Sequence, residues 1–254
     1  MLPDLTFFLA AVPAVILVGL SKGGLGGAFA LMGVPILAMV VPPMQAAAIF
    51  LPILLVMDMV ALWSWRHYND RKTLMLLLPG ALIGIVLGWA TSAYISTNAM
   101  RIILGIVTLL FVLRYFYDTL GPNAGREIAP KPQRVVPATF WSTFSGYASF
   151  VAHAGGAPFQ IYVLPLKLDP RTYTGTSTRF FAIVNLIKVI PYFALGELDS
   201  TNLALSGLML PVALLSTLAG AAVVRRMKPV VFYPLMYAMA LIAALKLFWD
   251  GFGL

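Results

Sequence analysis

The chain contains no cysteine and only two histidines, His67 and His153, among its 254 residues. The absence of cysteine excludes disulfides, iron–sulfur clusters and zinc sites with thiolate ligands. Two histidines are too few for a multi-histidine metal centre, so we expect no metal ion and no other cofactor. The sequence also has no phosphate-binding glycine loop, no Ser/His/Asp set and no paired carboxylates. We therefore predict that the protein is not an enzyme and has no catalytic residues.

Charged residues are scarce as well. They make up 10% of the chain, whereas a soluble domain carries about 25%. Hydrophobic residues account for 61% and the mean hydropathy is +0.92, which predicts an integral membrane protein surrounded by the lipid bilayer. The net charge of +8 comes from basic residues at the ends of apolar segments, where positive-inside topology explains them. Nucleic acid is therefore not an expected partner.

Ten apolar segments, five in each half of the chain, are candidates for membrane helices, which need about 20 residues for a full span. They cover residues 6–20, 25–41, 44–65, 73–94 and 99–117 in the first half, and 138–152, 155–166, 173–195, 202–224 and 230–249 in the second. In each half the first two segments are short, and a glycine-rich break separates them. Each such pair is predicted to be a broken pair of tilted spans or a re-entrant hairpin, and both options give the same topology.

The distribution of charge between these segments predicts their orientation. Three loops are basic: they contain Arg66, Arg71 and Lys72; Arg114, Arg126, Lys131 and Arg134; and Arg225, Arg226 and Lys228. Five segments per half place all three loops on one side, which the positive-inside rule makes cytoplasmic. We therefore predict a multi-pass protein of the bacterial inner (plasma) membrane with both termini in the periplasm. The oligomeric state is not defined by the sequence.

An odd number of segments per half makes the two halves inverted relative to each other. The halves also align at an offset of about 130 residues, a register in which prolines, glycines and charges coincide. The aligned pairs are Gly26/Gly156, Pro35/Pro165 and Asp58/Lys188 at an offset of 130, and Pro79/Pro211, Gly88/Gly220 and Arg114/Lys246 at an offset of 132. The predicted fold is therefore an all-α polytopic membrane protein with two inverted-topology repeats of five helical segments. Residues 1–118 form the first repeat, 119–137 a cytoplasmic linker and 138–254 the second repeat.

The first glycine-rich break carries a lysine inside an apolar stretch. A charge at membrane depth costs roughly 2.5–3.5 kcal/mol, so we expect Lys22 to face a cavity or a counter-ion. Beside the free backbone N–H groups of a helix start, its ammonium is suited to bind an anion. The alternative is a side chain that reaches the cytoplasmic surface. The predicted substrate-binding residues of this break are Ser21, Lys22, Gly23, Gly24, Gly26 and Gly27.

The second break contributes His153, which can donate hydrogen bonds to an anion and take up a proton near neutral pH. The alternative is a structural histidine that is bonded to a backbone carbonyl. Gln160 and Tyr162 follow at a spacing that allows both to reach the same cavity, although ordinary helix packing also explains them. The predicted substrate-binding residues of this half are His153, Gly155, Gly156, Gln160 and Tyr162.

A polar stripe on segment 173–195 includes Thr178, Asn185 and Lys188, which share one helical face. In a membrane helix such a face points to the protein interior, so we predict that these three residues also bind substrate. Asp58, the repeat equivalent of Lys188, is the only acidic residue deep in any predicted span. Two interpretations stay open: a mutual Asp58–Lys188 ion pair, or an anion bound by Lys188 while Asp58 tunes it or carries a proton.

These motifs resemble those of the TauE/SafE family of sulfite exporters and toluene-sulfonate uptake permeases. The resemblance covers nearly the whole chain. It rests on Gly19-Leu-Ser-Lys-Gly-Gly-Leu-Gly-Gly27 followed by Pro35, and on Ser149-Phe-Val-Ala-His-Ala-Gly-Gly-Ala-Pro158, Tyr162-Val-Leu-Pro165, Leu168-Asp-Pro170, Gly175-Thr176 and Asn185-Leu-Ile-Lys188. Ala157 stands where the family's Gly-Gly-Pro-Pro pattern has a proline. The resemblance implies transport of a sulfur-containing anion such as sulfite, a sulfonate or sulfoacetate, in either direction.

We therefore expect a secondary transporter for a small organic or inorganic anion that works by alternating access, with substrate held between the two breaks. No ATP site is present in the sequence, so the energy comes from a gradient, of H⁺ or another coupling ion or of the substrate, or from a partner. The alternatives are a channel-like anion pore and a non-transporting membrane assembly subunit.

Overall fold

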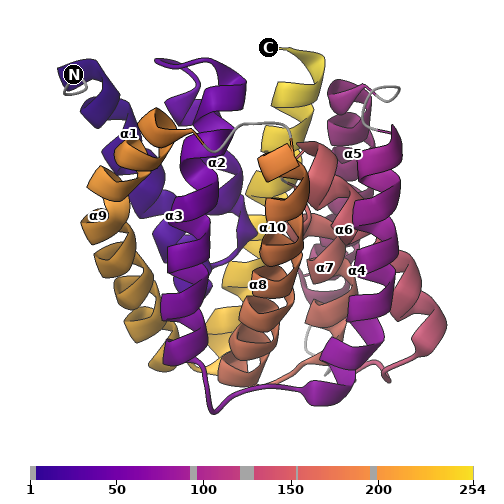
Figure 1. Ribbon diagram of the computed structural model, residues 1–254. Coiled ribbons are helices and arrows are strands. Elements are labelled where there is room, and N and C mark those ends of the chain that lie inside the picture. The colour runs from indigo at the N-terminus through magenta and orange to yellow at the C-terminus, as the bar shows by residue number, and fades with distance from the viewer. Residues whose placement is uncertain (1–3, 92–95, 121–128, 153, 195–198, 254) are drawn as a thin grey trace. The chain divides into compact units, whose positions relative to one another are not determined.

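The computed structural model describes residues 4–91, 96–120, 129–152, 154–194 and 199–253, and these residues form helices and loops without any β-strand (Figure 1). The α-helices are α1 (Leu5–Leu20), α2 (Gly27–Leu37), α3 (Pro43–Ser64), α4 (Arg71–Thr91), α5 (Thr97–Leu120), α6 (Val135–Ala152), α7 (Gly156–Val163), α8 (Pro170–Ala194), α9 (Ser200–Arg225) and α10 (Pro229–Phe252). A π-helical turn, η1 (Ser21–Leu25), joins α1 to α2, and a 3₁₀ turn, η2 (Leu164–Leu166), follows α7.

The helices fall where the apolar segments predict them, and most ends lie within three residues of the expected positions. Six stretches in the described residues are long and apolar enough to cross a membrane. They are Leu5–Leu25, Gln45–Ser64, Arg71–Thr91, Thr97–Leu120, Ser200–Arg225 and Pro229–Phe252. These stretches confirm the prediction of an all-helical, multi-pass membrane protein.

Polar residues and proline define several helix starts. The carboxylate of Asp4 accepts a hydrogen bond from the backbone N–H of Phe7 and caps α1, and Asp199 caps α9 in the same way through Asn202. Helices α3 and α10 begin with proline, which lacks an N–H group and therefore leaves none unpaired at that position.

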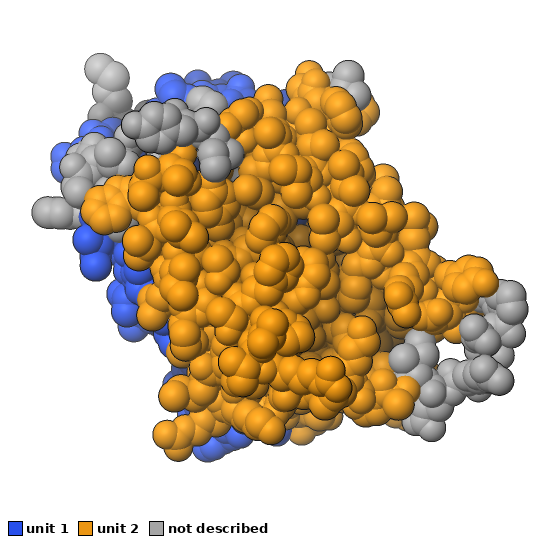
Figure 2. All heavy atoms as spheres, turned by 90° about the vertical axis from the view of Figure 1, so that its right-hand side faces the viewer, with its two compact units in different colours: residues 1–69, 174–227 blue, residues 70–173, 228–254 orange. Residues whose placement is uncertain are grey.

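The chain divides into two compact units, coloured separately in Figure 2. Unit 1 comprises residues 1–69 and 174–227, and unit 2 comprises residues 70–173 and 228–254. Within unit 1, α9 packs against α1 and α3; within unit 2, α4 packs against α6, and α5 against α10. Each unit therefore combines helices from both halves of the sequence.

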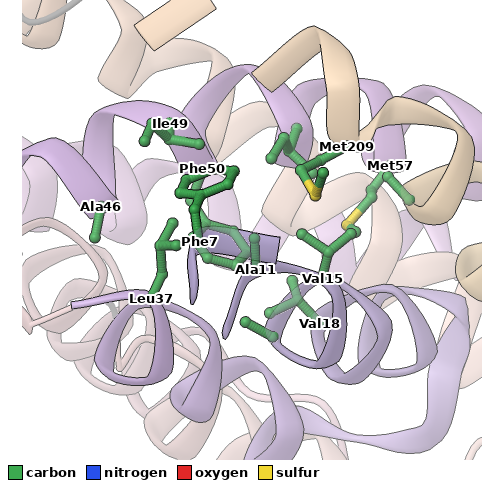
Figure 3. Packing of buried hydrophobic residues seen from close by; sticks show 13 residues of the cluster. Phe7, Ala11, Val15, Val18, Leu37, Ala46, Ile49, Phe50, Met57 and Met209 are labelled. Carbon is green, nitrogen blue, oxygen red and sulfur yellow. The ribbon is translucent and has the colours of Figure 1, made fainter. Parts of the chain in front are cut away.

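The apolar core of unit 1 holds α3 in place against α1, α2 and α9 (Figure 3). Its buried members come from all four helices: Phe7, Ala11, Ala14, Val15 and Val18; Leu37; Ala46, Ile49, Phe50, Ile53 and Met57; and Met209 and Ala213. Met57 is fully buried in this core and is followed directly by Asp58, which is also buried. The packing of α3 therefore fixes the position of the one carboxylate in the middle of this helix.

Glycines let α1 and the following π-turn approach α9 closely. A Cβ atom at Gly23 would lie 2.5 Å from the carbonyl oxygen of Thr217 and 2.6 Å from the Cα atom of Gly220. A Cβ atom at Gly19 would collide with Ser216 at 1.9 Å. Such stripes of small residues are typical of membrane helices that pack backbone to backbone.

Candidate functional site

The first glycine-rich break is a π-helical turn that ends in backbone conformations suited to glycine. Gly24 and Gly26 have φ angles of 129° and 102°, values that side chains with a Cβ atom rarely adopt. The hydroxyl of Ser21 donates a hydrogen bond of 2.6 Å to the carbonyl oxygen of Gly26, across the break. Helix α2 then starts at Gly27 without a side-chain cap. Its first N–H groups thus carry the partial positive charge of a helix N-terminus.

Lys22 in this break pairs with Asp58 of α3. Its Nζ atom lies 2.5 Å from Oδ1 of Asp58, and the two side chains are 14% and 4% exposed. The second carboxylate oxygen, Oδ2, accepts a hydrogen bond of 2.6 Å from the side-chain amide of Asn185 in α8. Both oxygens of this buried carboxylate therefore have partners, and the break, α3 and α8 meet at one polar cluster.

Lys188 completes the cluster from α8, three residues after Asn185. It is 3% exposed, and it lies close enough to Lys22 and Asp58 to interact electrostatically with both charges. Thr178 is buried on the same helix, whereas Leu186 and Ile190 are more than 60% exposed. This pattern, with a polar face inside and an apolar face outside, is the reverse of a soluble helix and fits a helix surrounded by lipid.

Trp65 links the end of α3 to the break. Its side chain is fully buried, and Nε1 donates a hydrogen bond of 3.1 Å to the carbonyl oxygen of Gly23. The guanidinium of Arg225 lies 5.5 Å from the Trp65 ring centroid and donates a hydrogen bond of 2.6 Å to the Ser64 carbonyl. This bond ties the backbone of the break to α3, so the indole N–H stabilises the irregular turn.

Arg179 of α8 binds the carbonyl groups at the C-terminal end of α3. It donates hydrogen bonds to the backbone oxygens of Trp65, Arg66 and Tyr68 at 2.7–3.2 Å, and also to that of Gly175 at 3.0 Å. A cation is favoured at a helix C-terminus, where unpaired carbonyls concentrate partial negative charge. Arg179 therefore serves as a clamp on the loop after α3.

The second glycine-rich break belongs to unit 2. The hydroxyl of Ser145 donates a hydrogen bond of 2.6 Å to the carbonyl oxygen of Gly155, and the N–H of Ala154 reaches the carbonyl of Ala148 at 3.1 Å. Here too the following helix, α7, starts without a side-chain cap. Both breaks therefore combine a serine bonded to a glycine carbonyl with an uncapped helix start.

Two further predicted residues follow on α7. The side chain of Gln160 is buried and is hydrogen-bonded to Tyr173. The hydroxyl of Tyr162 donates a hydrogen bond of 3.3 Å to the backbone oxygen of Arg134, and Tyr162 lines a pocket together with Lys131 and Trp141. Tyr162 is thus bonded to the linker segment that precedes α6.

The structure places the predicted site residues in five segments. Ser21, Lys22, Gly23 and Gly24 lie in the π-turn, with Gly26 and Gly27 at the start of α2; Gly155 and Gly156 lie at the start of α7, with Gln160 and Tyr162 within it; Asp58 lies in α3; and Thr178, Asn185 and Lys188 lie in α8. His153 lies outside the described residues. Lys22, Asp58, Asn185 and Lys188 come together in unit 1, and their role in binding stays a prediction.

Comparison with known proteins identifies the family. Residues 11–247 match the family model described as "Sulfite exporter TauE/SafE". The chain belongs to the TauE/SafE family. Comparison with curated proteins and with solved structures found no significant match. Because TauE/SafE proteins are membrane transporters rather than enzymes, this chain is a transporter, as the resemblance implied.

Three contacts in this TauE/SafE protein were not indicated by the sequence. The register of the repeats related Asp58 to Lys188. In the structure, Lys22 lies within hydrogen-bonding distance of Asp58 and forms an ion pair with it. The bonds from Trp65 to the break and from Arg179 to the end of α3 were also not foreseen. A tryptophan directly before a basic loop is the one local sequence signal that points to the bond from Trp65 to the break.

Proposed function

We propose that this TauE/SafE protein is a secondary transporter that moves a small sulfur-containing anion, such as sulfite, a sulfonate or sulfoacetate, across the bacterial inner membrane. One observation carries the proposal: the buried Asp58 and Lys188 and the largely covered Lys22, whose side chain is 14% exposed, lie together at a helix break in a membrane-spanning chain. Buried charges in membrane proteins are costly and mark substrate or ion pathways. A cluster with more cations than anions is suited to a negatively charged substrate.

In this proposal Lys22 and Lys188 attract the anion, and Asp58 and Asn185 hold the lysines in position. The uncapped start of α2 follows the break directly and offers backbone N–H groups of the kind that bind sulfur and phosphorus oxyanions. Alternating access, with substrate held between the two breaks, rests on the sequence pattern of broken helices in both halves. The same proposal includes the energy source for transport, which is a gradient of H⁺ or of another coupling ion.

Uptake into proteoliposomes tests this function. The purified protein should give saturable uptake of labelled sulfite or isethionate, and external substrate should accelerate the exit of preloaded label. Lys188→Met should lower kcat/KM at least about tenfold, because the substrate loses a cation in a region of low permittivity. Lys72→Met, a change of the same size at an exposed lysine in the first turn of α4, is the matched control and should leave uptake unchanged.

Flux that does not saturate and shows no exchange between internal and external substrate would support a channel-like pore instead. Absence of flux for every sulfur anion tested would contradict the proposal. The Lys188 variant must elute as a monodisperse species in detergent for its loss of uptake to count.

We also propose that the chain is built from two inverted repeats, as the sequence register predicts. Two close contacts support this. A Cβ atom at Gly220 of α9 would lie 2.6 Å from the carbonyl oxygen of Leu20, and a Cβ atom at Gly88 of α4 would lie 3.1 Å from Cβ of Phe150. Gly88 aligns with Gly220 at an offset of 132 residues, and Leu20 with Phe150 at an offset of 130. Equivalent helix pairs thus meet at equivalent residues in the two units.

The proposed orientation, with basic loops in the cytoplasm and both termini in the periplasm, has support from contacts within each unit. In unit 1, Arg225 at the end of α9 binds the end of α3 at Ser64. In unit 2, Gln133 of the linker donates hydrogen bonds to Asp70 and Thr73 at the start of α4. The loop between α3 and α4 is thus adjacent to both other basic segments, as a shared cytoplasmic side requires.

A further inference from the structure

Unit 2 contains a pocket beside the linker segment, residues 129–134, that leads into α6. Its volume is about 410 Å³, within the range of sites that bind small molecules. The walls come from the linker segment, from the start of α6, and from the stretch between α7 and η2. Two basic residues and an apolar surface face the pocket, and they include Lys131, Arg134, Pro137, Trp141, Ile161 and Leu166.

Hydrogen bonds fix the linker segment against the opposite wall of the pocket. The backbone N–H of Lys131 donates a bond of 2.9 Å to the carbonyl oxygen of Pro165, and the hydroxyl of Tyr162 donates one of 3.3 Å to the backbone oxygen of Arg134. Both bonds use the backbone of the basic residues, so the charged side chains take no part in them. The pocket is therefore built into the fold of unit 2.

The charges around the pocket have one sign. None of the residues that line it is acidic, and within the part of the chain that the structure describes neither Lys131 nor Arg134 forms an ion pair. Asp70 interacts electrostatically with Tyr162, but its carboxylate already accepts a hydrogen bond from the side chain of Gln133. Both basic side chains are exposed and therefore charged, and a ligand with a negative group can balance them.

The pocket lies at the boundary of the membrane. Helix α4 is long and apolar enough to span a bilayer, and the bond from Gln133 to Asp70 places the linker segment level with the start of this helix. On α6 the side chains of Val135 and Val136 are exposed directly after Arg134. Exposed apolar residues at the start of a membrane helix contact acyl chains, and basic residues just outside them lie among the headgroups. Lipid headgroups are therefore at the level of the pocket.

We propose that this pocket binds an anionic phospholipid: Lys131 and Arg134 contact its phosphate, and the apolar wall covers its glycerol backbone. The two cations favour a lipid with a net negative charge over a zwitterionic one, because each basic residue near the membrane surface attracts anionic headgroups. The apolar wall favours a lipid over a soluble phosphate ester, which has little apolar surface to bury. The bound lipid holds the start of α6 at the membrane surface. This lipid site lies in unit 2 alone and does not depend on which anion the protein transports.

Lipid titration of the purified protein in detergent, followed by native mass spectrometry, tests the site. Phosphatidylglycerol and phosphatidylcholine with identical acyl chains differ in net charge, so the dissociation constants of the first bound lipid isolate the effect of charge. We expect phosphatidylglycerol to bind at least about tenfold more tightly. In Lys131→Gln/Arg134→Gln this preference should fall to within about threefold. Arg226→Gln/Lys228→Gln removes two like charges from another basic loop, outside the pocket, and should keep the preference.

A soluble headgroup separates a lipid site from a site for a free anion. The compound sn-glycerol 3-phosphate carries a phosphate on glycerol but has no acyl chains. A ligand that binds only the folded protein raises its melting temperature. Phosphatidylglycerol should therefore raise the melting temperature, and sn-glycerol 3-phosphate at the same concentration should leave it unchanged.

Three results would overturn the proposed lipid site. Equal affinity of the unaltered protein for the two lipids would contradict it without any variant. A pocket variant that keeps the full preference, or a control variant that loses it, would assign the preference to other basic residues. Equal stabilisation by sn-glycerol 3-phosphate and phosphatidylglycerol would assign the pocket to a soluble phosphate ester. Lys131→Gln alone should lower the preference at least about threefold, and this milder variant decides if the double variant does not fold.

Discussion

The indole nitrogen of Trp65 lies 3.1 Å from the carbonyl oxygen of Gly23 and donates a hydrogen bond to it. This bond joins the end of α3 to the π-turn that carries Lys22. The same helix, α3, also carries Asp58, which binds Lys22 directly. Helix α3 therefore holds the break at two points, one through the backbone and one through the charged side chain.

The first prediction concerns Trp65. Replacement by Phe keeps an aromatic ring but removes the N–H donor, which leaves the carbonyl of Gly23 without this partner. We expect a loss of about 2 kcal/mol in stability from the unpaired acceptor and the smaller ring, together with reduced anion uptake. Trp63→Phe on the same helix is the control, because Trp63 is 63% exposed. Equal melting temperatures of the two variants in detergent would contradict a structural role for the Trp65 bond.

The second prediction concerns the charge pair. Asp58→Ala leaves the ammonium of Lys22 and the amide of Asn185 without their carboxylate, and breaking a buried pair in this way costs about 3–5 kcal/mol. The double variant Lys22→Met/Asp58→Asn removes both charges and should lose less than about 1 kcal/mol. Asp118→Asn is the control, because its partner Arg114 is 82% exposed at 3.8 Å. Thermal unfolding in detergent measures all three, and a double variant less stable than Asp58→Ala would refute the pairing.

The helices themselves were predictable from the sequence. Apolar runs bounded by charged residues and prolines define membrane segments, because the bilayer imposes a length of about 20 residues. The break at Ser21–Leu25 was also predictable, since glycines and a lysine inside an apolar run have no place in a lipid-facing helix.

The partner of Lys22 was not predictable in the same way. Lys22 and Asp58 are 36 residues apart, and their meeting depends on how α3 packs beside the break, which no local pattern encodes. The repeat register instead related Asp58 to Lys188, and this register describes equivalence between halves rather than contact. The bonds of Arg179 to the end of α3 are likewise tertiary, so an arginine near a helix end is consistent with both a membrane-interface anchor and a clamp.

The third prediction concerns that clamp. Lysine in place of Arg179 keeps the charge but lacks the planar guanidinium that reaches four carbonyl oxygens. We expect Arg179→Lys to lower stability by about 1 kcal/mol, because these bonds are only partly buried. Arg226→Lys at the exposed end of α9 provides the control. If the two variants unfold at the same temperature, the bonds from Arg179 contribute nothing to stability.

The fourth prediction concerns glycine packing between the π-turn and α9. At Gly23 a methyl group would lie 2.5 Å from the backbone of α9, so Gly23→Ala forces the two backbones apart. We expect a loss of at least about 2 kcal/mol and of transport, as for an overpacked core. Gly207→Ala in α9 meets no atom within 4 Å and should be neutral or stabilising by up to about 1 kcal/mol. Wild-type stability and uptake in Gly23→Ala would show that the close approach is not required.

The last prediction concerns orientation, which the chain makes simple to measure because it has no native cysteine. His67 in the basic loop after α3 and Thr201 at the start of α9 are both exposed. They lie at opposite ends of unit 1, since the start of α9 at Ser206 binds Ile49 near the start of α3 while its end binds Ser64. A membrane-impermeant maleimide added to intact cells should therefore label Thr201→Cys and spare His67→Cys until the cells are opened. The reverse pattern would place the basic loops outside, against the positive-inside rule, and would invert the direction assigned to the whole chain.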